Sequence, residues 1–192
     1  MNDLLWIFVS AAIINNFTLT YFLGLCPFFG VSNKIDTALR MAAANIFVLV
    51  ITSFSTWVLN TFVLFRAEYL RLIAFIVAIA CTVQFVEMVI KKTSPALFKA
   101  LGIYLPLITT NCAMLALALF QTTRGYGLLQ GQAYALGAGV GLGLALLIMA
   151  GIRQENELVT IPKLVRGAAM NFFIAGILSM AFMGFAGLFS SH

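Results

Sequence analysis

Apolar runs of nearly equal length dominate the sequence and most constrain its fold. Five such runs occupy 41–65, 70–90, 101–120, 133–152 and 168–189, and a sixth, broken run occupies 4–31. Each unbroken run is near the ~20 residues that a helix needs to cross a bilayer core. Hydrophobic residues make up 62% of the chain and charged residues 9%, which the surface of a water-soluble domain of this size does not tolerate. We therefore expect an all-α integral membrane protein with six transmembrane helices.

The basic residues predict the orientation of these helices. With six crossings, eight of the 11 basic residues fall in the loops on one side: Lys34, Arg40, Lys91, Lys92, Lys99, Arg153, Lys163 and Arg166. The other side holds Arg66, Arg71 and Arg124. Because cytoplasmic loops carry the excess of lysine and arginine, both termini are expected to face away from the cytoplasm. The net charge of +5 then reflects topology, and we expect no nucleic-acid partner.

The first and fourth runs are interrupted by polar residues. Residues 4–14 would rise only about 16 Å as a helix before Asn15 and Asn16, roughly half of the ~30 Å core. The fourth run carries Pro106 and then the polar segment 109–111. Broken first and fourth spans predict one membrane domain, 1–192, made of two inverted three-helix repeats, 1–95 and 96–192. Ordinary kinks whose polar residues bond neighbouring helices are the alternative.

Polar side chains at the breaks have a structural task in either case. An unpaired amide or carbonyl in lipid costs several kcal/mol, so irregular backbone must be satisfied by protein or water. The candidates for this role are Asn15, Asn16, Thr109, Thr110 and Asn111. The beginning of the chain, Met1-Asn2-Asp3, has an acid and no basic region, so we expect the first segment to be retained.

Two cysteines lie at these breaks. Gly24 and Pro27 bracket Cys26, and Asn111 precedes Cys112. Turns of this kind leave backbone amides free to donate to a thiolate, and soft thiolates favour a redox metal site. A mononuclear or iron-sulfur centre commonly takes four protein ligands, so a partner subunit would supply the other two. A disulfide between Cys26 and Cys112 is the competing interpretation.

Other chemistry-bearing residues have simpler structural interpretations. Cys81 lies in a regular apolar stretch and His192 has no sequence partner, so both are expected to be inert. Glu87 is a carboxylate near the inside of an apolar span, where acids are often functional, but Lys91 follows one turn later and favours an ion pair at the membrane rim. The glycines of 137–143 follow no predicted strand and favour close helix packing over a nucleotide site.

Several segments together resemble a known family. They are NNF at 15–17, FLGLCPFFGVS at 22–32, QFVEM at 84–88, KTSP at 92–95, LPLITTNCA at 105–113 and SMAFMGF at 179–185. These segments resemble the RnfA/NqrE family, which includes RnfA of the Rnf electron-transport complex and NqrE of the sodium-translocating NADH:quinone reductase. The likeness covers essentially the whole chain.

The resemblance implies a fold, a cofactor and partners. It implies a six-helix inverted-repeat subunit paired with an RnfE-like sister of opposite orientation, with a [2Fe-2S] cluster between them held by two cysteines from each chain. Carried onto this sequence, the ligands are Cys26 and Cys112. It also implies RnfB, RnfC, RnfD and RnfG as further partners, in a bacterial inner membrane with both termini periplasmic.

The implied activity belongs to the whole complex. Such a complex moves electrons between NADH and ferredoxin, coupled to Na+ or H+ translocation, and this chain would have no activity by itself. Three alternatives stay open: the equivalent NqrE of the quinone reductase, a cofactor-free solute or ion transporter with the same broken spans, and an inert assembly protein. The sequence leaves open the coupling ion and the choice between a [2Fe-2S] cluster and a bare iron.

Overall fold

The computed structural model describes residues 2–31, 35–62, 70–93, 108, 111–157 and 168–188. Every regular element within these residues is a helix. The bounds are α1 Asn2–Val9, the π-helical turn η1 Ser10–Ile14, α2 Phe17–Thr20, α3 Leu25–Val31, α4 Ile35–Phe62, α5 Arg71–Thr93, α8 Cys112–Thr123, α9 Leu128–Glu157 and α10 Ala168–Leu188. The predicted all-α class is confirmed for this part of the chain.

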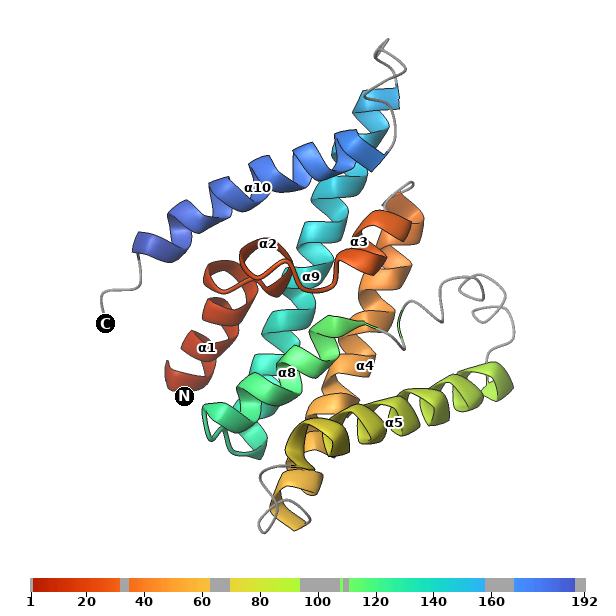
Figure 1. Cartoon of the computed structure of the whole chain (residues 1–192), viewed down its shortest axis with the longest axis vertical. Coiled ribbons are helices and arrows are strands. Elements are labelled where there is room, and N and C mark those ends of the chain that lie inside the picture. Colours follow the sequence, from red (N-terminus) through yellow and green to blue (C-terminus); the bar gives the residue numbers. More distant parts are fainter. Residues whose placement is uncertain are drawn as a thin grey trace.

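Two long helices of opposite direction, α4 and α9, form the centre of the fold (Figure 1). Glycines on α9 bring the two backbones together, since a Cβ added at Gly139 would meet Ile46 and one added at Gly143 would meet Ala42. The partner number on α4 falls as the number on α9 rises, so the helices are antiparallel. Small residues at such a seam allow the close approach that holds membrane helices together.

The other two glycines of the 137–143 segment face the opposite side. A Cβ at Gly137 would meet the Phe8 carbonyl, and one at Gly141 would lie 2.7 Å from the Ala12 carbonyl oxygen. The four glycines thus seat α1 and η1 on one side of α9 and α4 on the other. The close packing predicted from their spacing is confirmed.

Three helices are long and apolar enough to cross a membrane, namely Ile35–Phe62, Arg71–Val89 and Leu128–Asn156. Shorter apolar helices cover Leu4–Ile14, Cys112–Thr123 and Ala169–Gly184. In Figure 1, α5 and α10 run across the direction of α4 and α9 and extend outward on opposite sides. Three long apolar helices fit an integral membrane protein, while six crossings in two inverted repeats stay a prediction.

The predicted break of the first span lies where the structure has one. Helical structure stops after η1 and resumes with α2, and Asn15 and Asn16 lie between them. For the fourth span, Pro106, Thr109 and Thr110 lie outside the described residues, whereas Asn111 directly precedes α8. Both breaks lead into the region where the two predicted ligand cysteines are found.

Candidate functional site

The first break joins a π-helical turn to a short α-helix. The Asn15 backbone N–H donates to the Ser10 carbonyl at 2.7 Å and closes η1. Asn16 then starts α2, and its side-chain Oδ1 accepts from the Thr18 N–H at 3.0 Å. An N-cap asparagine satisfies one of the four N–H groups that have no partner at the start of a helix. The predicted role of Asn16 in satisfying the break is confirmed.

Neighbouring helices hold this first break from two sides. The fully buried Asn16 uses its Nδ2 to donate to the Gly141 carbonyl of α9 at 2.8 Å. From α10, the Ser179 hydroxyl donates to the Leu19 carbonyl of α2 at 2.6 Å. Carbonyls at a break in lipid need such donors because water does not reach them. The first break is therefore closed by contacts inside this chain.

A left-handed turn leads from α2 to Cys26. Phe22 has φ of 55° and Gly24 has φ of 85°, and the Leu23 N–H donates to the Phe17 carbonyl at 3.0 Å. Glycine enters the left-handed region without the steric penalty that a Cβ brings. α3 begins at the next residue, which puts Cys26 in its first turn. Pro27 fits there because first-turn N–H groups lack helical partners in any case.

The second break repeats the asparagine cap directly before Cys112. Asn111 has φ of −73° and ψ of 113°, and its Oδ1 accepts from the Ala113 N–H at 3.1 Å. Cys112 is the first residue of α8. A negative charge is stabilised at a helix N-terminus, so this position suits a thiolate.

The two cysteine-bearing segments meet at Gly24. The Gly24 N–H donates to the Cys112 Sγ at 2.9 Å, joining residues that are 88 positions apart in the chain. A Cβ at Gly24 would lie 3.3 Å from the Asn111 Oδ1 and 3.5 Å from the Ala113 Cβ. Glycine is thus required twice, by the positive φ and by the closeness of the α8 start. The fold places the turn before Cys26 directly against Cys112.

Both predicted ligand sulfurs are accessible. Cys26, Cys112 and Cys81 are all exposed free cysteines, so the structure contains no disulfide between Cys26 and Cys112. Among the described residues, no group of three or more His, Cys, Asp or Glu side chains comes together as a metal site. Cys26 and Cys112 as metal ligands stay a prediction, and in this part of the chain a four-ligand centre would need donors from elsewhere.

Arg153 anchors the far end of α3. Its Nε donates to the Asn171 Oδ1 of α10 at 2.8 Å, and its Nη1 donates to the Phe29 carbonyl at 3.1 Å. Hydrogen bonds from a charged donor are stronger than neutral ones. Arg153 therefore ties α9, α10 and the short helix that carries Cys26 into one unit.

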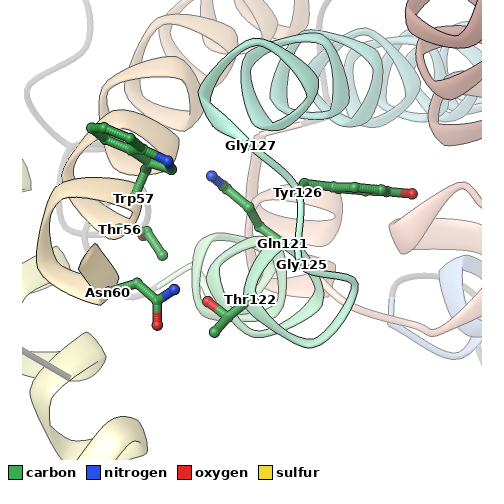
Figure 2. Close-up of a pocket in the computed structure, with 8 residues that line it drawn as sticks. All are labelled: Thr56, Trp57, Asn60, Gln121, Thr122, Gly125, Tyr126 and Gly127. Carbon is green, nitrogen blue, oxygen red and sulfur yellow. The ribbon is translucent and has the colours of Figure 1, made fainter. Parts of the chain in front are cut away.

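A polar cavity that the sequence did not lead us to expect lies at the other end of α4. The cavity has a volume of about 220 Å³, and its walls come from the end of α4, the end of α8 and the turn before α9 (Figure 2). Its lining residues are Thr56, Trp57, Asn60, Gln121, Thr122, Gly125, Tyr126 and Gly127. The signal was present in the sequence as polar residues at helical spacing inside the apolar run 41–65.

Arg124 lies beside this cavity in the turn between α8 and α9. Its Nη1 donates to the Tyr126 hydroxyl at 3.2 Å, and its guanidinium carbon is 5.6 Å from the centre of the Tyr134 ring. Burial alone lowers the pKa of Arg124, but the Tyr126 hydrogen bond and the nearby tyrosines raise it, with a net upward shift. The guanidinium therefore stays charged and is held by the aromatic rings.

Glu87 is half-buried on α5, and Lys91 is exposed one turn later. Their proposed ion pair stays a prediction.

Comparisons with known proteins place these features in a family. A family model described as "Rnf-Nqr subunit, membrane protein" matches residues 4–189. A protein of Syntrophotalea carbinolica is 50% identical over 190 residues, one of Azoarcus sp. strain BH72 is 49% identical, and one of Serratia proteamaculans is 47% identical. Each match covers 98% of both chains, and each relative is named as the RnfA component of an ion-translocating oxidoreductase complex.

Proposed function

This chain belongs to the Rnf-Nqr family of membrane-protein subunits, and we propose that it is the RnfA component of an ion-translocating NADH:ferredoxin oxidoreductase complex. The complex would couple electron transfer to Na+ or H+ translocation, and this chain would act only within it. The RnfA name of the relatives favours this assignment over NqrE of the quinone reductase.

Within the complex, the chain would hold half of a [2Fe-2S] cluster through Cys26 and Cys112. The other two ligands would come from an RnfE-like sister subunit inserted in the opposite orientation. The observation that carries this proposal is the contact between the Gly24 N–H and the Cys112 Sγ, because it joins the two cysteine segments. Both sulfurs are exposed, so a partner can reach them.

The residues present fit such a group. Cysteine sulfurs are the usual ligands of [2Fe-2S] clusters, and backbone N–H donors to the sulfurs stabilise the negative charge of the reduced state. Gly24 supplies one such donor, and the asparagine cap fixes the start of α8 beneath Cys112. When bound, the cluster supplies one-electron transfer between donors and acceptors on the two membrane sides. The chain's own residues would hold and orient it.

The arrangement we propose is two inverted repeats with six crossings. Its support is the antiparallel pair α4 and α9 and the matching caps Asn16 and Asn111, each of which starts a helix after a break. An odd number of crossings in each half inverts the second half, and this plan exposes backbone near the membrane centre. The excess of basic residues in alternate loops supports periplasmic termini in a bacterial inner membrane.

Replacing single cysteines in the purified complex tests the cluster assignment. Cys26→Ser and Cys112→Ser should each remove about two iron atoms per complex and abolish electron transfer, because serine does not replace a thiolate ligand. Cys81→Ser is the matched control, since Cys81 is also exposed but lies on α5. Iron analysis and electron paramagnetic resonance of the reduced complex measure the loss, while the signals of other subunits serve as an internal standard.

An unchanged iron content in Cys112→Ser would remove the proposal. The cofactor-free transporter would then be the better interpretation.

A further inference from the structure

One face of α4 carries a column of buried polar side chains. Asn45, Thr52, Ser53 and Thr56 are between 0% and 3% exposed. Their spacing of seven, eight and eleven residues from Asn45 puts them on one side of the helix. Polar side chains inside a membrane bundle are costly and commonly mark the route of an ion or substrate. The column therefore needs an explanation beyond helix packing.

Several polar atoms at the inner end of this column have no hydrogen-bond partner in the described part of the chain. They are both amide atoms of Asn45, the hydroxyl of Thr52 and the Nδ2 of Asn111. Buried polar atoms in proteins are nearly always satisfied by protein, water or an ion. The oxygens of Asn45 and Thr52 are thus free to bind a hydrated or partly hydrated guest.

The outer end of the column opens into the polar cavity. The Ser53 hydroxyl donates to the Gln121 Oε1 at 2.8 Å, and the Gln121 Nε2 donates to the Ser53 carbonyl at 3.3 Å. Gly131 on α9 leaves the space for this pair, since a Cβ there would collide with the Gln121 amide. Beyond the pair, Asn60 and Thr122 point toward each other across the cavity (Figure 2).

The column spans the depth between the cavity and the second break. α4 and α8 run in the same direction, with Ser53 bonded to Gln121. Asn45 precedes Ser53 by eight residues and Cys112 precedes Gln121 by nine, which correspond to about 12 Å and about 13 Å of helix rise. The inner end of the column and the Asn111–Cys112 break therefore lie at similar depth.

We propose that the polar face of α4, from Asn45 to Thr56, together with Gln121, lines a half-channel for a small alkali cation. It leads from the polar cavity to the level of the Asn111–Cys112 break. The inference rests on the proposed function, because it assigns to this chain part of the path of the ion that the complex moves. In the orientation that the basic loops favour, the half-channel opens on the non-cytoplasmic side.

The chemistry of the lining indicates a monovalent cation. The column presents hydroxyl and amide oxygens, which can replace water around a hard cation. Divalent cations are generally bound through carboxylates, and the residues of this column include none. The same lack of a titratable side chain favours Na+ over a proton relay along these residues.

Transport by the complex in proteoliposomes tests this path. Thr52→Val should reduce Na+ uptake per electron about tenfold, the factor expected for one lost oxygen contact. Electron transfer from NADH to ferredoxin without an ion gradient and the iron content should stay at the level of the unmodified complex. Thr52→Ser keeps the hydroxyl and should restore Na+ uptake. Because the Thr52 hydroxyl has no partner among the described residues, Thr52→Val should not lower the thermal midpoint.

Accessibility provides a second, independent test. In a Cys81→Ser complex, Thr52→Cys should react with a positively charged methanethiosulfonate reagent added from the non-cytoplasmic side, and Na+ should slow the reaction. Leu146→Cys is the matched control, because Leu146 is equally buried but lies in an apolar cluster with Leu142 and Met149. Mass spectrometry of the labelled peptide separates these sites from Cys26 and Cys112.

The outcomes separate the half-channel from the proposed function. If the unmodified complex takes up Na+ but Thr52→Val takes up as much, or Thr52→Cys reacts no faster than Leu146→Cys, the half-channel is wrong and the cluster assignment stands. If the unmodified complex moves protons and no Na+, the alkali-cation assignment is overturned. The cluster is judged separately, by the iron content of Cys112→Ser.

Discussion

Asn16 and Asn111 begin their helices in the same way but are held differently. Their φ and ψ angles are −65° and 115° for Asn16, and −73° and 113° for Asn111. In each case the Oδ1 accepts from the N–H two residues later. The Nδ2 of Asn16 donates to the Gly141 carbonyl, whereas the Nδ2 of Asn111 has no partner among the described residues.

The residue after each asparagine differs in the same sense. Phe17 is buried, stacked on Phe120 at 5.6 Å and edge-on to Tyr134 at 5.7 Å between ring centres. Cys112 occupies the matching position after Asn111 and is exposed. The first break is thus an internal anchor, while the second presents a soft ligand and a free amide. One local geometry serves structure in one half of the chain and, in our proposal, cofactor binding in the other.

The largest effect on this comparison is expected at the residue that joins the two breaks. Gly24→Ala forces a Cβ into the left-handed region and against Leu142 and Asn111. The two costs together should destabilise the chain by about 2–3 kcal/mol and displace Cys112. Thermal unfolding and iron content of the purified complex measure this. Gly176→Ala is the control, because a Cβ there meets nothing within 4 Å in the described structure. Equal behaviour of the two variants would contradict the role of Gly24.

Removing the anchored cap should cost nearly as much. Asn16→Ala loses the cap of α2 and the donor to the Gly141 carbonyl, for about 2 kcal/mol in total. The midpoint of denaturant unfolding in detergent measures the loss. Asn16→Ser keeps a capping oxygen and should recover about half of the lost stability. If Asn16→Ser were as unstable as Asn16→Ala, the cap would contribute nothing.

The equivalent change at the second break should cost less stability. Asn111→Ala removes only a cap, for about 1 kcal/mol, and Asn111→Ser should be close to neutral. The same denaturant titration compares the four asparagine variants directly. A cost for Asn111→Ser as large as that for Asn16→Ser would show that the Asn111 amide has a structural partner in the complex.

The smallest effect is expected outside both breaks. Cys81 is exposed on α5 and lies at neither helix start, so Cys81→Ser should change stability by less than about 0.5 kcal/mol. Electron transfer and iron content of the complex should be unchanged. A loss of iron in Cys81→Ser would move the site away from the two breaks.

Features that depend on neighbouring residues were predictable from the sequence. The apolar runs predicted a membrane protein of helices, Asn15 and Asn16 predicted the first break, and the glycines of 137–143 predicted close helix packing. Each follows from a local property: helix length against bilayer thickness, capping chemistry, and the lack of a Cβ. The resemblance added Cys26 and Cys112 as ligands, which stays a prediction.

The partners across the chain were decided only by the tertiary structure. Gly24 meets Cys112 from 88 residues away, Ser53 meets Gln121 from 68, and Asn16 meets Gly141 from 125. No local pattern specifies such contacts, because they depend on which helix faces are brought together when α4, α8 and α9 assemble. The sequence by itself determined which residues must be buried in a membrane and where the helices break. The packing of the helices decided that the first break is closed internally and that the second is left open beside Cys112.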